Sequence, residues 1–324
     1  MTDITAIRAA ADRATGHVRL TPLLSSPFLD DLAGRRVLVK AECLQHTGSF
    51  KFRGAWSAIS ALDTAQSAAG ILAFSSGNHA QAIAHAAHLH GTSSVIIMPS
   101  DAPQLKIDNT AALGGEVVLY DRASESREDI GEALRTERGL TLIPPYDHPQ
   151  VIAGQGTTGL EIAAQAAELG VTEADVVVCC GGGGLTAGIA LALEADAPAM
   201  RVRPAEPEGF DDVARSLASG ARLRNNALSG SICDAILTPM PGELTWPVLR
   251  RLCGPGLVVS EEECLRAMAL AWQRLKITVE PGGAAALAAA LFHPDAFDTD
   301  TVIVTASGGN VDTAMFTRAL ETLS

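Results

Sequence analysis

Lys51, in the stretch Thr47-Gly48-Ser49-Phe50-Lys51-Phe52-Arg53-Gly54, is the residue best suited to covalent chemistry. Only four of the 24 basic residues are lysines. Turn-forming residues precede Lys51 and a helix is predicted from about residue 55, so Lys51 would stand in a first helical turn. There the helix dipole disfavours its ammonium form. A lysine with a lowered pKa is a nucleophile that forms a Schiff base with a carbonyl, although an isolated lysine at a helix start is more commonly just solvated.

Three glycine-bearing loops are each predicted to follow a strand, at residues 75–79, 181–184 and 307–310. In open α/β sheets, ligands bind beyond the carboxyl ends of the strands. The loop Ser75-Ser76-Gly77-Asn78-His79 offers hydroxyls, an amide and a helix N-terminus together, which suits the carboxylate of an amino acid. Ser76 or Asn78 alone could equally be a simple helix cap.

The second loop is a run of four glycines, Gly181, Gly182, Gly183 and Gly184. Backbone N–H groups of such a loop, together with a helix N-terminus, form a phosphate cradle. The alternative is a tightly packed turn, at a high cost in backbone entropy. The Walker pattern is absent. Gly182-x-Gly184-x-x-Ala187, with Glu206 about 20 residues later, satisfies a loose dinucleotide fingerprint. An NAD(P)-dependent oxidoreductase is therefore an alternative, although it leaves Lys51 and the 75–79 loop unexplained.

Strands and helices alternate along the whole chain, which predicts an α/β fold with parallel sheets flanked by helices. Predicted helices cover 4–14, 80–89, 105–113, 126–137, 155–169, 185–194, 261–275 and 283–291, and predicted strands cover 36–40, 71–74, 95–98, 116–120, 140–143, 175–180, 200–204 and 301–305. Residues 205–260 look less regular. The pattern predicts two domains, with a small domain at 70–147 inserted in a large domain formed by 1–69 and 148–324, and a cleft between them.

The composition narrows the class of protein. A formal net charge of −13 argues against nucleic acid or an anionic membrane as partners. Six cysteines show no metal-binding spacing and are expected to be buried thiols of a reducing compartment. The N-terminus lacks the apolar core of a signal peptide, and no apolar stretch is long enough to span a membrane. We therefore expect a cytoplasmic protein whose partner is a small molecule.

Four motifs, taken in order, resemble a known family. They are Gly48-Ser49-Phe50-Lys51-x-Arg53-Gly54-Ala55, Ser76-Gly77-Asn78-His79, the four glycines, and Ser307-Gly308-Gly309-Asn310. The chain is similar to the fold-type II pyridoxal-phosphate enzymes (tryptophan synthase β-like), specifically the serine/threonine dehydratase and serine racemase group. The resemblance spans about residues 21–312. With no regulatory domain after the last motif, the chain resembles the short catabolic members.

The resemblance implies cofactor roles for several residues. Lys51 would form the Schiff base with pyridoxal 5'-phosphate and later remove the Cα proton. Phe50 would pack against the cofactor ring, Asn78 would hold the ring hydroxyl, and Gly181 to Gly184 would hold the phosphate. Ser307 would face the pyridine nitrogen, where a hydroxyl leaves the nitrogen largely unprotonated and disfavours transamination.

The resemblance also implies a substrate site. Ser75, Asn78 and His79 would bind the substrate carboxylate, and Arg127 would lie near the substrate mouth. A serine at the place of Ser76 protonates the opposite face in racemases of this group, so Ser76 leaves racemisation open.

The segment Ala205-Glu206-Pro207-Glu208-Gly209-Phe210-Asp211-Asp212 resembles the divalent-cation site of the group. Glu206, Asp212 and the Phe210 carbonyl would offer hard oxygen ligands for Mg²⁺, Mn²⁺ or Ca²⁺. The alternative is a solvated acidic helix start. A homodimer is expected from the resemblance alone.

Two segments depart from serine racemase, namely Tyr146-Asp147-His148 and residues 235–247. Both are expected to border the substrate side chain, so specificity does not carry over. The sequence predicts a β-eliminating ammonia-lyase that converts a 3-hydroxy amino acid, by default L-threonine or L-serine, to a 2-oxo acid and ammonia. A 3-hydroxyaspartate dehydratase is the closest alternative and would need a further cation, for which Arg127 or His148 is a candidate. Serine racemase is another alternative. The intact Lys51, Asn78 and Ser307 argue against a non-catalytic binding protein.

Overall fold

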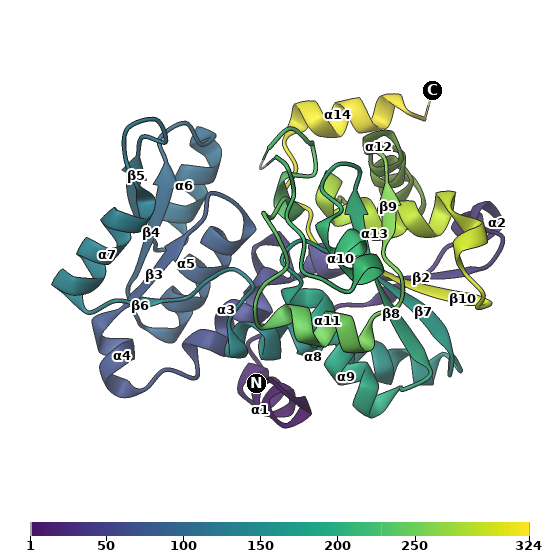
Figure 1. Ribbon diagram of the computed structural model, residues 1–324, viewed down its shortest axis with the longest axis horizontal. Coiled ribbons are helices and arrows are strands. Elements are labelled where there is room, and N and C mark those ends of the chain that lie inside the picture. Colours follow the sequence, from purple (N-terminus) through teal and green to yellow (C-terminus); the bar gives the residue numbers. More distant parts are fainter. Residues whose placement is uncertain (1, 228, 324) are drawn as a thin grey trace.

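The computed structural model describes residues 2–227 and 229–323 and shows two β-sheets with mostly parallel strands, each flanked by helices. The two sheet units lie side by side (Figure 1). The large sheet has the strand order β1-β2-β10-β7-β8-β9 and the small sheet has the order β5-β4-β3-β6. The α/β class predicted from the sequence is confirmed.

The large sheet is parallel except for its first strand. β1 (Leu23–Leu24) pairs antiparallel with β2 (Arg36–Lys40), and β10 (Thr301–Thr305) pairs parallel with both β2 and β7 (Ala174–Cys179). β8 (Met200–Pro207) and β9 (Leu257–Val259) complete the sheet. Every residue of β7 and β10 is buried, because helices cover both faces.

The small sheet is wholly parallel and falls within residues 70–147. Its strands are β3 (Ile71–Phe74), β4 (Ser94–Pro99), β5 (Glu116–Tyr120) and β6 (Thr141–Leu142). α4 (Thr64–Ala69), α5 (Asn78–His90), α6 (Gln104–Ala112) and α7 (Arg127–Arg138) alternate with these strands. The domain boundaries at residues 70 and 147 stay a prediction.

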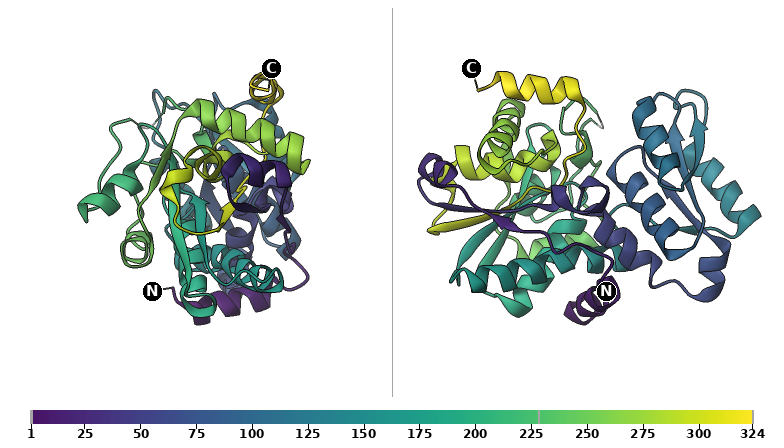
Figure 2. Two further views of the ribbon diagram at one scale, coloured as in Figure 1. Left: turned by 90° about the vertical axis from the view of Figure 1, so that its right-hand side faces the viewer. Right: turned by 180° about the vertical axis from the view of Figure 1, so that it is seen from behind.

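α3 (Lys51–Ile59) lies where the two sheet units meet, packing on α5 and on α8 (Pro149–Glu168). α8 in turn packs on α9 (Gly184–Asp196) and on α1 (Ile4–Ala14). Figure 2 shows α1 and the final helix α14 (Thr313–Glu321) at opposite ends of the large sheet unit.

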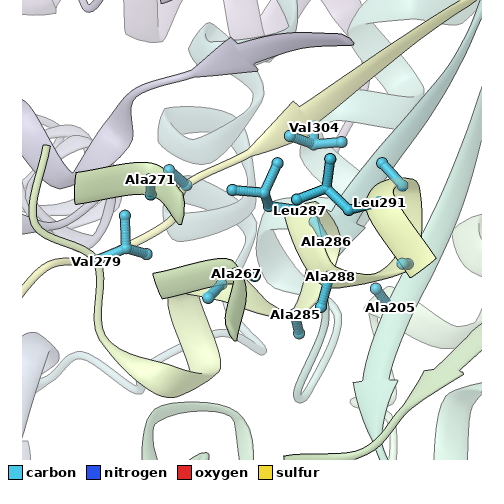
Figure 3. Packing of buried hydrophobic residues seen from close by; sticks show 14 of the residues in the cluster. Ala205, Ala267, Ala271, Val279, Ala285, Ala286, Leu287, Ala288, Leu291 and Val304 are labelled. Carbon is cyan, nitrogen blue, oxygen red and sulfur yellow. The ribbon is translucent and has the colours of Figure 1, made fainter. Parts of the chain in front are cut away.

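The core of the large unit is built around an alanine-rich helix, α13 (Pro281–Phe292). Small side chains let it lie close to its neighbours. Ala285 and Ala288 are fully buried on the side of α13 that faces Ala267 of α12 (Glu261–Leu270) and Ala205 of β8, while Leu287 reaches toward Val304 of β10 (Figure 3).

Several elements differ from the sequence prediction. α8 begins at Pro149 rather than near residue 155, although its first turns hold glycines that disfavour helix. A Cβ at Gly154 would collide with the Arg53 carbonyl, and one at Gly159 would come within 2.9 Å of Ile189 Cα, so close helix packing outweighs propensity. The predicted helix 261–275 ends as an α-helix at Leu270 and continues as a π-helix to Leu275.

Short elements were missed. Residues 205–260 contain α10 (Asp212–Ser219), α11 (Thr245–Leu252) and β9, where prolines had suggested irregular chain. Pro247 is the third residue of α11, where its missing N–H removes no intrahelical hydrogen bond. α2 (Pro27–Ala33) and α4 were also missed, because each is too short to show a clear period.

Candidate active site

Two cavities meet at Lys51, which lines both. The outer one has a volume of about 480 Å³ and lies between the two sheet units. Predicted site residues that line the inner cavity are Phe50, Lys51, Gly181, Gly182, Gly183 and Gly184. Those that line the outer cavity are Lys51, Ser75, Ser76, Asn78, His79 and Arg127. The fold therefore brings together residues that are far apart in the sequence.

Lys51 is the first residue of α3, as predicted, and its Nζ donates a hydrogen bond to the Pro145 carbonyl at 2.8 Å. Its pKa is lowered from 10.5 to about 8 by burial, against a smaller opposing effect of the Glu280 carboxylate. The pKa of Lys51 is therefore lowered, as predicted, and its largest cause is desolvation, which the sequence did not reveal. Lys51 is a nucleophilic amine held at the junction of the two cavities.

The four glycines connect β7 to α9, and the helix begins at Gly184. Gly183 has φ of +89°, a left-handed conformation that favours glycine. A Cβ at Gly182 would overlap the ring of Tyr146, which lies directly against the loop. The loop therefore presents bare backbone and a helix N-terminus to the inner cavity, an arrangement suited to a phosphate group.

The loop at residues 75–79 turns into α5, which begins at Asn78. The Ser75 hydroxyl accepts a hydrogen bond from the Gly77 N–H at 3.2 Å. His79 is buried and its Nε2 donates to the Ile143 carbonyl at 2.9 Å. Burial, with the nearby Lys51 charge, lowers the pKa of His79 to about 3. The imidazole is therefore neutral, and only the backbone N–H of His79 is suited to bind a carboxylate.

Glu280 was missed by the sequence analysis, and it lines the outer cavity beside Asn78 and Asn310. Its Oε1 accepts a hydrogen bond from Asn78 Nδ2 at 2.6 Å, while Asn78 Oδ1 accepts from Asn310 Nδ2 at 2.8 Å. These bonds fix the Asn78 amide and leave one of its N–H groups available. Burial raises the pKa of Glu280 to about 7. The residue lies more than 200 positions after Lys51, and no local motif marks it.

Ser307 follows β10 but lines neither cavity. Its carbonyl accepts a hydrogen bond from the Phe50 N–H at 3.1 Å, and its side chain contacts the buried Cys179, which does line the inner cavity. Ser307 thus joins the Lys51 loop to the wall of the inner cavity.

Besides Lys51, the outer cavity is lined by the cationic side chains of Arg127 and Lys106. Arg127 stands at the start of α7, pairs with Glu128 at 2.8 Å and lies over the Phe74 ring. Lys106, which the sequence analysis did not select, reaches across to Asp234 at 3.3 Å. His148 lines neither cavity, and burial lowers its pKa, so of the two predicted cation candidates only Arg127 is suitably placed.

The predicted cation ligands lie at the end of β8 and the start of α10. The Glu206 carboxylate accepts hydrogen bonds from the N–H groups of Val213 and Ala214, at 3.0 and 2.7 Å. Asp212 Oδ1 accepts from Asn225, whereas the buried Asp212 Oδ2 has no hydrogen-bond partner among the residues that the structure describes. Burial raises the pKa of both carboxyl groups. Among the described residues, no group of three or more His, Cys, Asp or Glu side chains could hold a metal ion.

Comparisons with known proteins place this geometry in a family. Residues 14–308 match the family model described as pyridoxal-phosphate dependent enzyme. The chain belongs to this family. The enzyme is 42% identical to L-threo-3-hydroxyaspartate ammonia-lyase of Pseudomonas sp, over 96% of each chain, and 39% identical to serine racemase of Arabidopsis thaliana, over 96% of this chain and 93% of the relative. It is 36% identical to the solved serine racemase of Dictyostelium discoideum, with a TM-score of 0.89, over 96% of this chain and 99% of the solved chain. It is 45% identical to a solved threonine deaminase, with a TM-score of 0.90, over the same shares of the two chains.

These relatives confirm the fold-type II assignment and set aside the dinucleotide alternative. Glu206, the acidic residue of that fingerprint, lines neither cavity. The pyridoxal-phosphate-dependent enzyme has the two features that this cofactor needs, a buried amine and, beside it, a glycine loop whose backbone lines the inner cavity. All six cysteines are free thiols. None of the helices in the described ranges is both long and apolar enough to span a bilayer.

Proposed function

We propose that the enzyme is an ammonia-lyase that removes water from a 3-hydroxy amino acid, L-threonine or L-serine, and releases a 2-oxo acid and ammonia. The observation that carries the proposal is the position of Lys51. Its amine, with a pKa of about 8, stands between a backbone phosphate cradle and a polar cavity large enough for an amino acid. The homodimer and the cytoplasmic location stay predictions.

Separate groups of residues would bind the cofactor and the substrate. When bound, pyridoxal phosphate supplies an electron sink for the bond broken at the substrate Cα. Gly181 to Gly184 would hold the phosphate, Phe50 would contact the ring, and the N–H of Asn78 would hold the ring hydroxyl. Ser307, which joins the Lys51 loop to the wall of the inner cavity, would help to position the ring.

The substrate carboxylate would bind at the start of α5, where Ser75, Asn78 and His79 line the outer cavity, with the backbone N–H of His79 as a donor. Neutral Lys51 takes the proton from Cα and holds it on Nζ. That proton then passes from Nζ to the β-hydroxyl, which leaves as water as the Cα–Cβ double bond forms. A water molecule hydrolyses the resulting enamine to the 2-oxo acid and ammonia. Ser76 lines the same cavity, where its hydroxyl would stand on the face opposite Lys51 and return a proton in a racemase reaction.

A second candidate substrate is 3-hydroxyaspartate, which carries a further carboxylate. Arg127 and Lys106 both line the outer cavity, so two cations face the space beyond the 75–79 loop. Guanidinium and ammonium groups are the partners that a carboxylate prefers. Relatives named as hydroxyaspartate ammonia-lyases or dehydratases are 38–42% identical to this chain. They support hydroxyaspartate as strongly as the other relatives support serine or threonine.

The test measures 2-oxo acid and ammonia with L-serine, L-threonine and the 3-hydroxyaspartate isomers, and follows D-amino acid formation in the same reactions. Turnover of serine or threonine supports the first candidate, and turnover of hydroxyaspartate alone supports the second. Arg127→Met should then lower kcat/KM for hydroxyaspartate about 100-fold and that for serine far less. Arg122→Met is the matched control, because Arg122 is an exposed arginine paired with Asp101 that lines neither cavity. Absence of 2-oxo acid with every substrate would contradict the lyase function.

We also propose that Glu206 and Asp212, with the Phe210 carbonyl, hold a divalent cation. The unpartnered Asp212 Oδ2 and the proximity of two buried carboxyl groups support this donor set. Mg²⁺ or Ca²⁺ added to metal-free protein should raise its melting temperature, and Asp212→Asn should remove that rise.

A further inference from the structure

The carbonyl of Gly182 is held by the segment that begins α11. It accepts a hydrogen bond from the Gly242 N–H at 3.1 Å and another from the Thr245 hydroxyl at 2.7 Å. Thr245 is fully buried and, like Gly242, lines neither cavity, whereas Gly182 and Gly183 line the inner one. The 182–183 peptide therefore stands between α11 and the inner cavity.

This arrangement fixes the direction of one backbone donor. The C=O and N–H of a trans peptide point in opposite directions, and the structure contains no cis peptide bond among the described residues. Because the Gly182 carbonyl points toward α11, the Gly183 N–H points away from α11 and into the inner cavity. The positive φ of Gly183 then turns the chain into α9.

Asp147 holds the start of α11 in place. Its Oδ2 accepts a hydrogen bond from the Glu243 N–H at 2.8 Å, and its Oδ1 accepts from the N–H groups of Leu244 and Thr245 at 2.8 and 3.3 Å. A Cβ at Gly242 would overlap this carboxylate, so the approach requires glycine. One carboxylate thus satisfies three otherwise unpaired donors at a helix start.

The same segment of chain also contacts the catalytic lysine and the glycine loop. The Pro145 carbonyl accepts the Lys51 hydrogen bond, and the Tyr146 ring lies on Gly182. Three consecutive residues, 145 to 147, therefore tie Lys51, the four glycines and α11 together. Their relative positions are set by chain that returns from the small sheet to α8.

We propose that Thr245 and Asp147 are positioning residues that aim the Gly183 N–H at the phosphate group of the cofactor. Thr245 orients the 182–183 peptide by its hydrogen bond to the Gly182 carbonyl. Asp147 fixes the backbone of residues 243–245, and with it the position of Thr245, by hydrogen bonds to their N–H groups. This inference rests on the proposed use of the four glycines as the phosphate site. It adds two residues that none of the four sequence motifs includes.

The test compares cofactor-free protein binding pyridoxal phosphate with the same protein binding pyridoxal, which lacks the phosphate. Thr245→Val removes the hydroxyl at nearly constant volume and leaves the Gly182 carbonyl bonded to Gly242. It should weaken pyridoxal phosphate about tenfold, as expected for one misaimed charge-assisted hydrogen bond, and leave pyridoxal affinity unchanged. Thr245→Ser should restore the affinity. The ³¹P NMR shift of the bound phosphate should move in the valine variant only.

Thr317→Val is the matched control, because Thr317 is an exposed threonine of α14 whose hydroxyl donates to the backbone of its own helix. If the valine variant does not fold, Asp147→Asn is measured in its place. It should lower the affinity for pyridoxal phosphate at least as much and leave the affinity for pyridoxal unchanged. Equal weakening of both ligands, or no weakening, would overturn the positioning role. Wild-type protein that binds both ligands equally tightly would instead contradict the phosphate site itself.

Discussion

Burial of Lys51 makes its amine reactive near neutral pH. At pH 7.5 a pKa of about 8 leaves about a quarter of the Lys51 side chains neutral, against about one in a thousand at the usual 10.5. The neutral form is therefore about 200-fold more abundant than in an ordinary lysine. Because the pKa is lowered, reactivity should rise with pH up to about 8 and then level off.

The assay is pulse acetylation of cofactor-free protein across pH 6 to 11, with peptide mass spectrometry resolving each lysine. The exposed Lys276 serves as the internal reference. The readout is the midpoint of each pH profile, which does not depend on how easily the reagent enters the cavity. Glu280→Gln should move the Lys51 midpoint lower still, because the Glu280 carboxylate is the charge that raises it. A Lys51 midpoint near 10.5, the ordinary value for a lysine, would refute the argument from burial.

Three further predictions concern stability and cofactor binding. Arg53→Met should reduce the free energy of unfolding by about 3–5 kcal/mol in urea titrations, because it leaves the buried Glu42 carboxylate without its charge partner. Arg8→Met, the control, breaks an exposed ion pair and should reduce the free energy of unfolding by less than about 1 kcal/mol. Cofactor-free protein should lose stability as pH rises from about 4.5 to about 7, the window in which folded Glu280 binds more protons than unfolded Glu280. Glu280→Gln should flatten that loss, and an unchanged slope would contradict it. Gly182→Ala should lower pyridoxal phosphate affinity more than about tenfold by dialysis, because the Tyr146 ring must move.

The Arg53 prediction rests on a buried network that the sequence did not reveal. Arg53 pairs with Glu42 at 2.7 Å and with Glu161 at 2.6 Å, and Glu161 also pairs with the fully buried Lys40. Burial alone would raise the pKa of Glu42, but the Arg53 charge and hydrogen bonds outweigh it and lower the pKa. This stabilisation is present above pH 4.5 and is lost as the pH falls through the lower folded-state pKa.

Local sequence signals were enough to predict the loops of the site. Turn residues before Lys51 gave the start of α3, and the four glycines between an apolar strand and an apolar helix gave the inner cavity. Such signals act within a few residues, where capping and backbone freedom decide the structure.

Long-range contacts could not be predicted in the same way. Glu280, at the start of α13, reaches Asn78 because α13 packs against the large sheet, and Asp147 reaches α11 across about a hundred residues of chain. α8 extends through its glycines because neighbouring helices approach closely there. These contacts depend on tertiary packing, and a single sequence does not show which distant residues come into contact.

The most direct test of the account is the visible absorption spectrum of purified protein with added pyridoxal phosphate, before and after Lys51→Ala. Lys40, Lys106 and Lys276 remain in the variant as controls for non-specific reaction with amines. The account predicts a band from the covalent Lys51–cofactor bond in the wild type, its loss in the variant, and loss of 2-oxo acid formation with it. A band of equal strength in the variant would contradict the central place of Lys51.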